Sequence, residues 1–326
     1  MRLSRKRSHA ETDCVTESTL PSDVKEAIHR KLQDASFRVS VKDVTQQVLF
    51  NQETPLLISE ELFTVHPLEI SDLERKKLQC VEWQPSERTG VLAKHKRALR
   101  NVLNEKRDWL EHPFALYDFV GLDADTSQAA SRLLDSLDVF DEGAVMSFGS
   151  TFTRYHVEDY AMANLQTLQR RQGNSFKAWF IVVDPVRGQQ LRRAQDHVVS
   201  ERLVESADYI IIQREGETIY VPPLAYHAVL TAYHRDIPVK DRYTVLSGTL
   251  FADTRSGSLW RKRLVVWAQN HQTGHRHSGG QNRDAVYRGY AKYLDVPTTK
   301  RRPSKQQRKK DKAAKASNSR WSKGSK

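Results

Sequence analysis

From residue 144 to residue 251 the sequence consists of short strand-like runs separated by turn residues. Several runs alternate apolar and polar side chains, as strands do when one face lies in a core. The runs cover residues 144–148, 152–157, 176–183, 209–213, 218–221, 226–231 and 243–251. One helical segment, near residues 185–202, interrupts them. Many short strands of this kind favour a double-sheet barrel, so we predict a mainly β fold with flanking helices.

The segments on either side of these strands differ from them in composition. We predict that residues 1–20 are a disordered leader and that residues 21–110 form a mixed region of helices and strands. Residues 111–272 should hold the barrel and a C-terminal helix. Residues 273–326 are rich in Gly, His, Ser and basic side chains, and we expect a disordered basic tail there.

The net charge of +12 lies almost entirely at the C-terminal end. From Thr298 to Lys326 there are twelve Lys or Arg and one acid, Asp311, which gives 12 − 1 = +11. Two roles remain open for this tail. It could keep the protein soluble, or it could act as a nuclear import signal and nucleic-acid contact, which the clusters Lys300–Arg302 and Arg308–Lys310 favour. We therefore expect a nuclear protein.

The sequence also predicts whether the protein contacts a membrane and whether its compartment is reducing. No apolar run approaches the roughly 18 residues that a membrane span needs, and the basic N-terminus lacks the apolar stretch of a signal peptide. There are two cysteines, Cys14 and Cys80, too few for a disulfide framework. We expect no membrane contact and a reducing compartment.

Two histidines and a glutamate in the strand-rich part form a candidate metal site. His156 and Glu158 are two residues apart, so on a strand both side chains would lie on one face. His227, on another strand-like run, can supply the third ligand. Two imidazoles and a carboxylate leave the other metal positions open, which is the ligand set of non-haem Fe(II) oxygenases. The alternative for His227 is a core histidine bonded to the backbone.

A single lysine interrupts one of the most apolar runs. Lys177 lies between Phe176 and Trp179. A lysine directed into a barrel interior is costly unless it meets an anion there. The alternative is an edge-strand lysine whose long side chain reaches solvent.

Three segments around these residues resemble the Jumonji C (JmjC) oxygenases. Gly149–Asp159 resembles the first metal motif of that family, Phe176–Trp179 its Lys-x-Trp strand, and Gln213–Val229 its Gly-Glu, Pro and His-Ala run. They occur in the family's order between residues 140 and 250. The resemblance implies a double-stranded β-helix, which is a jelly-roll or cupin-like core, and an Fe(II)- and 2-oxoglutarate-dependent dioxygenase that uses O2.

The resemblance also implies a role for each candidate residue. His156, Glu158 and His227 would bind Fe(II). Lys177 would hold the distal carboxylate of 2-oxoglutarate, and Thr153 would make a second contact with that carboxylate. No catalytic residue beyond the metal ligands is expected.

The sequence departs from the family's pattern in two places. Residues 169–174 form a polar run that predicts a longer loop than usual before Lys177. Thr231 stands where many histone demethylases of the family have Asn. Asn164, between the first two motifs, is a further candidate for contact with cosubstrate or substrate.

Three functions follow from the resemblance, and the sequence leaves all three open. The leading one is histone lysine demethylation, with a histone tail as the protein substrate. Hydroxylation of a ribosomal or other protein side chain comes next. A catalytically silent chromatin- or RNA-binding scaffold is the third.

Overall fold

The computed structural model describes residues 9–32, 38–46, 49, 53–65, 81–82, 114–117, 124–135, 137–158, 161–170, 175–194, 199–238, 241–252 and 258–270. The chain divides into two units, residues 1–284 and 285–326. All described residues belong to the first unit. The predicted basic tail and most of residues 66–113 lie outside them.

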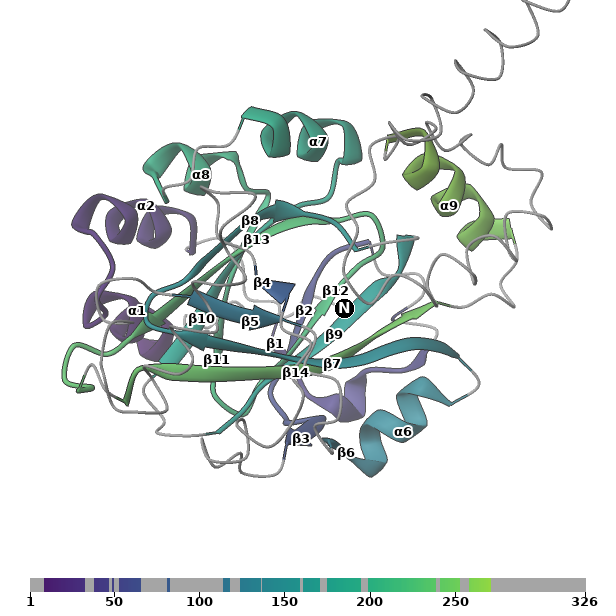
Figure 1. Ribbon diagram of the computed structural model, residues 1–326, viewed down its shortest axis with the longest axis horizontal. Coiled ribbons are helices and arrows are strands. Elements are labelled where there is room, and N and C mark those ends of the chain that lie inside the picture. The colour runs from purple at the N-terminus through teal and green to yellow at the C-terminus, as the bar shows by residue number, and fades with distance from the viewer. Residues whose placement is uncertain are drawn as a thin grey trace, which may run out of the picture. The chain divides into compact units, whose positions relative to one another are not determined.

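The first unit is built mainly from two β-sheets (Figure 1). The larger sheet contains β1 (Arg38–Val39), β2 (Leu56–Ile58), β4 (Val81–Glu82), β5 (Phe114–Tyr117), β7 (Asp138–Phe148), β9 (Ala163–Leu168), β12 (Thr218–Val221) and β14 (Tyr243–Ala252). The smaller sheet contains β8 (Phe152–His156), β10 (Ser175–Val182), β11 (Tyr209–Arg214) and β13 (Tyr226–Tyr233). A further pair is formed by β3 (Phe63–Val65) and β6 (Ala124–Thr126).

Strand pairing is antiparallel throughout the described sheets, except between β1 and β2. The larger sheet has the order β1-β2-β12-β9-β14-β7-β5-β4, and the smaller has the order β11-β10-β13-β8. The prediction of a mainly β fold with flanking helices is confirmed.

The two sheets pack face to face over a shared apolar core. Trp179 and Ile181 of β10 lie in one buried cluster with Leu168, Ile219 and Leu246 of the larger sheet. The side chains at alternate positions of β10 point the other way, because successive strand residues face opposite sides. Strand β10 is therefore buried on both faces, which explains its nearly continuous apolar sequence.

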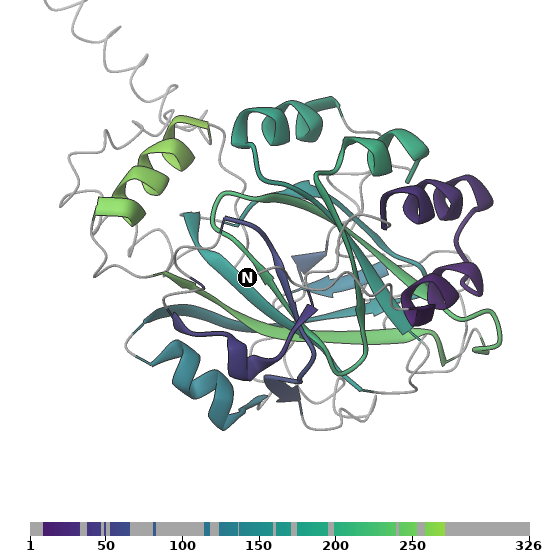
Figure 2. The same cartoon turned by 180° about the vertical axis from the view of Figure 1, so that it is seen from behind.

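Helices cover the outer face of the smaller sheet (Figures 1 and 2). They are α1 (His9–Thr16), α2 (Ser22–Leu32), α7 (Pro185–Ala194) and α8 (Glu201–Ser206). In α2, Val24, Ala27 and Ile28 are buried at the spacing of one helix face. The Lys25 ammonium donates to the backbone oxygens of Thr16 and Ser18, which satisfies carbonyls at the end of α1.

The N-terminal segment differs from our expectation. Residues 9–20, which we expected to be part of a disordered leader, contain helix α1 and bury Val15, Ser18 and Leu20. Ser18 forms a β-bridge with His234, and the backbone N–H of Thr19 donates to the Tyr233 carbonyl at 3.0 Å. The partners lie more than 200 residues away along the chain, so the local sequence gave no indication of them.

The outer face of the larger sheet is covered by α6 (Gln128–Leu134) and by η1 (Val41–Asp43) with its neighbours. The Ser127 hydroxyl accepts the Ala130 N–H at 3.1 Å and so caps the start of α6. A last described helix, α9 (Ser258–Asn270), follows β14. Within the described part of the chain, no helix is long and apolar enough to cross a membrane.

Two other elements depart from the sequence analysis. Strand β9 was not predicted, because its Asn164, Gln166 and Thr167 make it look like part of a polar loop. The single helical segment predicted near residues 185–202 is two helices, α7 and α8. Within the predicted long loop, residues 171–174 lie outside the described residues.

Gly248 allows β14 to approach β9 closely, and its replacement by alanine is expected to destabilise the protein. A Cβ at this position would collide with the backbone oxygen of Leu165 and lie 2.8 Å from the Cα of Gln166. Overpacking of this kind costs roughly 1–3 kcal/mol. Urea denaturation should show a lower midpoint for Gly248→Ala, whereas Thr64→Ala, at an exposed strand position, should change it little. Equal midpoints would contradict this packing.

Candidate metal centre

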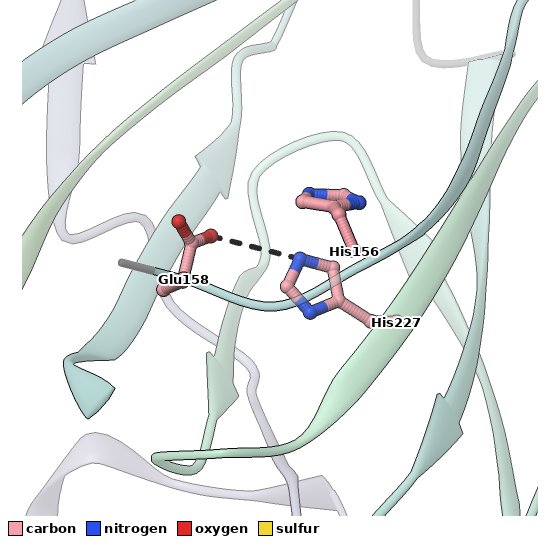
Figure 3. Close-up of side chains that lie close together, drawn as sticks. All are labelled: His156, Glu158 and His227. Atoms are coloured by element: carbon pink, nitrogen blue, oxygen red, sulfur yellow. Dashed lines mark ion pairs between the residues drawn. The ribbon is translucent and has the colours of Figure 1, made fainter. Parts of the chain in front are cut away.

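Three side chains from two neighbouring strands converge at one end of the smaller sheet (Figure 3). His156 is the last residue of β8, and Glu158 lies two residues beyond it. His227, in β13, is directly opposite His156. One potential ligand atom from each residue lies within 4.8 Å of the other two. The group can therefore hold a metal ion. Glu158 lies beyond the end of the strand, although we had expected both residues on it.

A β-bulge between β8 and β13 sets which residues of β8 face this group. His227 pairs with His156 and Val229 pairs with Thr153, with a register shift between the pairs. From Thr153 to His156 the chain advances three residues in β8, whereas the paired β13 advances only two. His156 and Thr153 therefore face the same side of the sheet, although three residues of a regular strand would place them on opposite sides. Val229 belongs to the core between the sheets. Thr153 is half-buried beside it, at a position from which a hydroxyl can face the site.

Both histidines are oriented by backbone carbonyls. The Nδ1 atom of His156 lies 2.8 Å from the Arg154 oxygen, and the Nδ1 atom of His227 lies 3.2 Å from the Ala225 oxygen. A carbonyl can only accept a hydrogen bond, so each Nδ1 carries a proton. In the neutral ring the lone pair is then on Nε2, the atom that can bind a metal.

Burial keeps His227 in the form that a metal requires. Its side chain is 1% exposed, and desolvation lowers its pKa from 6.5 to about 4, partly offset by the Ala225 carbonyl. The ring is therefore neutral at pH 7. Its Nε2 atom lies 3.6 Å from Oε1 of Glu158, and the two rings of His156 and His227 are 4.1 Å apart between centroids. A metal ion bound at this point would lie between the two rings and the Glu158 carboxylate, which are otherwise close neighbours.

A chain of two amides supports the glutamate from β9. The Asn164 Nδ2 donates to Oε1 of Glu158 at 2.7 Å, and the Gln166 Nε2 donates to Oδ1 of Asn164 at 2.7 Å. From the sequence, Asn164 is expected only as a contact for cosubstrate or substrate, and Gln166 is not expected at the site. The spacing of the two residues could have indicated Gln166, because side chains two positions apart on a strand such as β9 lie on the same face.

Shortening the Asn164 side chain is expected to weaken metal binding without removing a ligand. In Asn164→Ala the Glu158 carboxylate loses its donor, and loss of such an outer partner typically costs about 10–100-fold in metal affinity. Gln166→Leu should cost less, because it acts only through Asn164. Titration with Mn(II) would measure both constants. Wild-type affinity in Asn164→Ala would exclude this supporting role.

Lys177 is buried between the sheets. Its side chain lies on the same face of β10 as Trp179 and Ile181, and it is 2% exposed. Its ammonium donates to Thr231 Oγ1 at 2.8 Å and to Ser147 Oγ at 3.2 Å. Among the described residues no carboxylate pairs with it. Desolvation lowers its pKa from 10.5 to about 7. The alternative of a lysine that reaches solvent from a sheet edge is wrong.

Thr231, the position where the sequence departs from the JmjC pattern, is a hydrogen-bond partner of Lys177. Its hydroxyl accepts from Lys177 and also from Thr151 Oγ1 at 3.0 Å. Lys177 and Thr231 face each other directly across β10 and β13. The lysine is thus surrounded by neutral hydroxyls, which can solvate an ammonium group but cannot neutralise it.

Aromatic residues close to the candidate ligands pack in the core. Tyr155 and Tyr226 flank the metal ligands in sequence but are buried in the cluster under the helices. The tilted ring of Trp179 lies 5.6 Å from that of His227, and its Nε1 donates to Gln213 Oε1 at 2.8 Å. Asp159 lies outside the described residues.

No protein-family model matches this chain. A search of curated proteins also gave no match. The site itself combines a partly buried His-Glu-His group that can hold a metal ion with a buried lysine in the same core.

Proposed function

We propose that this protein is an Fe(II)- and 2-oxoglutarate-dependent dioxygenase of the JmjC type, with the two facing sheets as its double-stranded β-helix core. The observation that carries the proposal is Lys177. A fully buried ammonium without a carboxylate partner among the described residues is unfavourable by itself. It becomes favourable when an anion binds beside it, and the far carboxylate of 2-oxoglutarate is such an anion.

The three candidate ligands fit Fe(II). Two neutral imidazoles and one carboxylate are the ligand set of non-haem iron oxygenases, with open positions for small molecules. Each histidine has its Nδ1–H on a carbonyl, and Glu158 is held by Asn164. When bound, Fe(II) supplies the activation of O2, so that 2-oxoglutarate, O2 and a substrate C–H bond become succinate, CO2 and a C–OH group.

The chain's own residues position and shield the reactants. Lys177 and its hydroxyl neighbours would orient the cosubstrate through its distal carboxylate, and Thr153 would add a hydroxyl donor. Trp179, Ile181 and Val229 line the same interior and exclude water, which strengthens each charged contact. His156 and Glu158 are less buried than His227, and the substrate would approach on their side.

The leading substrate is a methylated lysine of a histone tail. Hydroxylation of an N-methyl carbon gives an unstable product that releases formaldehyde and leaves the demethylated amine. The basic sequence of residues 298–326 supports a nuclear protein that works close to nucleic acid. Incubation with Fe(II), ascorbate, 2-oxoglutarate and methylated histone peptides, followed by mass spectrometry, should reveal loss of the mass of one methylene group per methyl removed.

Thr231 favours a second candidate, which is hydroxylation of a ribosomal or other protein side chain. Many histone demethylases of the family have Asn at this position, whereas Thr231 here is engaged by Lys177 and Thr151. The same experiment with ribosomal peptides separates the two, because a stable hydroxylation adds the mass of one oxygen atom. If neither peptide set changes and no succinate forms, the catalytically silent scaffold remains.

The affinity for 2-oxoglutarate is expected to fall above pH 7. Only the protonated Lys177 can neutralise a carboxylate, and its pKa in the anion-free protein is about 7. The dissociation constant should therefore rise about tenfold per pH unit between pH 7 and pH 9. Calorimetry with Mn(II) in place of Fe(II) can measure it.

The matched control for this pH dependence is Lys177→Arg. Arginine stays charged throughout this range, so the dependence should disappear in the variant whatever its absolute affinity. A wild-type dissociation constant that is flat from pH 7 to pH 9 would contradict the assignment of Lys177.

A further inference from the structure

Two helices of the first unit carry basic side chains and no acid. Helix α7 contains Arg187, Arg192 and Arg193, and helix α9 contains three consecutive cations at 261–263. Together they hold six positive charges without an Asp or Glu. We call α7 and α9 the basic helix pair.

The basic helix pair lies next to the candidate metal centre. Helix α7 contacts β8 and β13, the two strands that carry His156 and His227, and it also contacts α9. Figures 1 and 2 show α9 beside α7 in opposite views. Gly188 of α7 packs so closely on the ring of Tyr226 that a Cβ would collide with it. Tyr226 immediately precedes His227, so this contact fixes α7 at the ligand-bearing end of β13.

Two cations of the basic helix pair, Arg193 and Lys262, have no acidic partner among the described residues. Arg187 forms an ion pair with Asp208, and Arg192 hydrogen-bonds the Tyr226 phenol. Arg193 and Lys262 are both exposed. Repulsion between like charges on the two helices destabilises the folded protein, and a bound polyanionic partner would reduce this repulsion.

We propose that the basic helix pair binds the phosphate backbone of a nucleic acid beside the metal centre. The exposed Arg193 offers a planar guanidinium group, which matches phosphate oxygens in pairs, and the exposed Lys262 adds a second positive charge. The sequence that follows α9 ends in residues 298–326, which carry a further +11. Charge distributed over two helices and a long tail suits a polymer with a charge on every unit better than a short acidic peptide. The inference does not depend on the oxidation chemistry, since binding requires no metal.

A charge-reversal comparison in the full-length chain tests the proposal. The test variant is Arg193→Glu with Lys262→Glu. The matched control is Lys42→Glu with Arg132→Glu, at exposed positions on η1 and α6. Each double variant changes the net charge from +12 to 12 − 4 = +8. Binding of a short labelled single-stranded RNA, a DNA duplex and a polyglutamate peptide is followed by fluorescence anisotropy across a salt series.

The test variant should raise the dissociation constant of RNA or of DNA at least tenfold. Its salt slope should fall by about 1.4 for a single strand and by about 1.8 for a duplex, since each lost phosphate contact removes about 0.7 or 0.9. The control should keep nearly the full affinity and slope. If both variants weakened binding equally, the loss would be explained by net charge alone, and the proposal would be overturned. Unchanged binding would also overturn it, as would a loss confined to polyglutamate, which would identify an acidic peptide as the partner.

Discussion

His156→Ala is expected to reduce succinate formation to background, the largest effect on activity predicted here. The substitution removes one of three candidate ligands and leaves only a glutamate and the buried His227. Loss of an outer partner alone costs about 10–100-fold in metal affinity, so removal of a ligand should cost more than about 100-fold. His156 is only half-buried, and the variant should fold normally. Turnover and Mn(II) affinity would both be measured.

The control for this variant is His234→Ala. His234 follows the same strand, β13, at its other end, and it pairs with Glu17 at 2.7 Å. Seven residues separate it from His227, or about 23 Å along an extended strand. Activity should remain close to that of the wild type. If His156→Ala retained succinate formation while His234→Ala lost it, the metal centre would have to be sought elsewhere.

Lys177→Met is expected to abolish 2-oxoglutarate binding and, at the same time, to stabilise the protein without cosubstrate. Burial lowers the pKa of Lys177 from 10.5 to about 7. At about 1.4 kcal/mol per pH unit, the charged lysine costs folding about 5 kcal/mol at low pH. Methionine fills a similar volume without that cost. The hydroxyls of Ser147 and Thr231 lose a donor, so we expect a net gain of about 2 kcal/mol.

The pH dependence of this gain has a definite sign. Below pH 7 both the folded and the unfolded protein hold the proton on Lys177, and the cost is present in full. Between pH 7 and pH 10.5 the folded protein has released it while the unfolded chain has not, so the wild-type protein gains stability as the pH rises. The advantage of Lys177→Met should therefore be largest below pH 7 and shrink towards pH 10.5.

Urea denaturation of wild type, Lys177→Met and Lys42→Met at several pH values would measure this dependence. Lys42 is exposed, so its variant should follow the wild type at every pH. A Lys177→Met protein that binds 2-oxoglutarate as tightly as the wild type would contradict the role given to this lysine. A large loss of stability would instead indicate that the ammonium is needed for folding.

The sequence indicated the parts of the site that depend on strand alternation. The apolar surroundings of Lys177 indicated a buried cation, and the spacing of His156 and Glu158 with a distant His227 indicated a metal group. Both follow from residue types and short spacings. The two-sheet core could be predicted because β10, β13 and β14 are long, mainly apolar runs that are buried on both faces.

Other features depend on contacts that no local pattern contains. Thr153 faces the site only because of a bulge in β8, and the extra residue of a bulge has no sequence signature in this run. Strand β9 presents Asn164 and Gln166 towards the metal group, so its inward face is polar where a core strand would be apolar. Helix α1 is held by residues of the turn after β13, far along the chain.

The central claim is that His156, Glu158 and His227 bind one metal ion while Lys177 receives the carboxylate of 2-oxoglutarate. A crystal structure of the protein grown without oxygen, with Mn(II) and 2-oxoglutarate, tests it most directly through anomalous scattering. We predict one strong anomalous peak in contact with both Nε2 atoms and the Glu158 carboxylate, and 2-oxoglutarate density that ends at the Lys177 ammonium. A peak elsewhere, or density that leaves Lys177 without an anion at saturating ligand, would contradict the account.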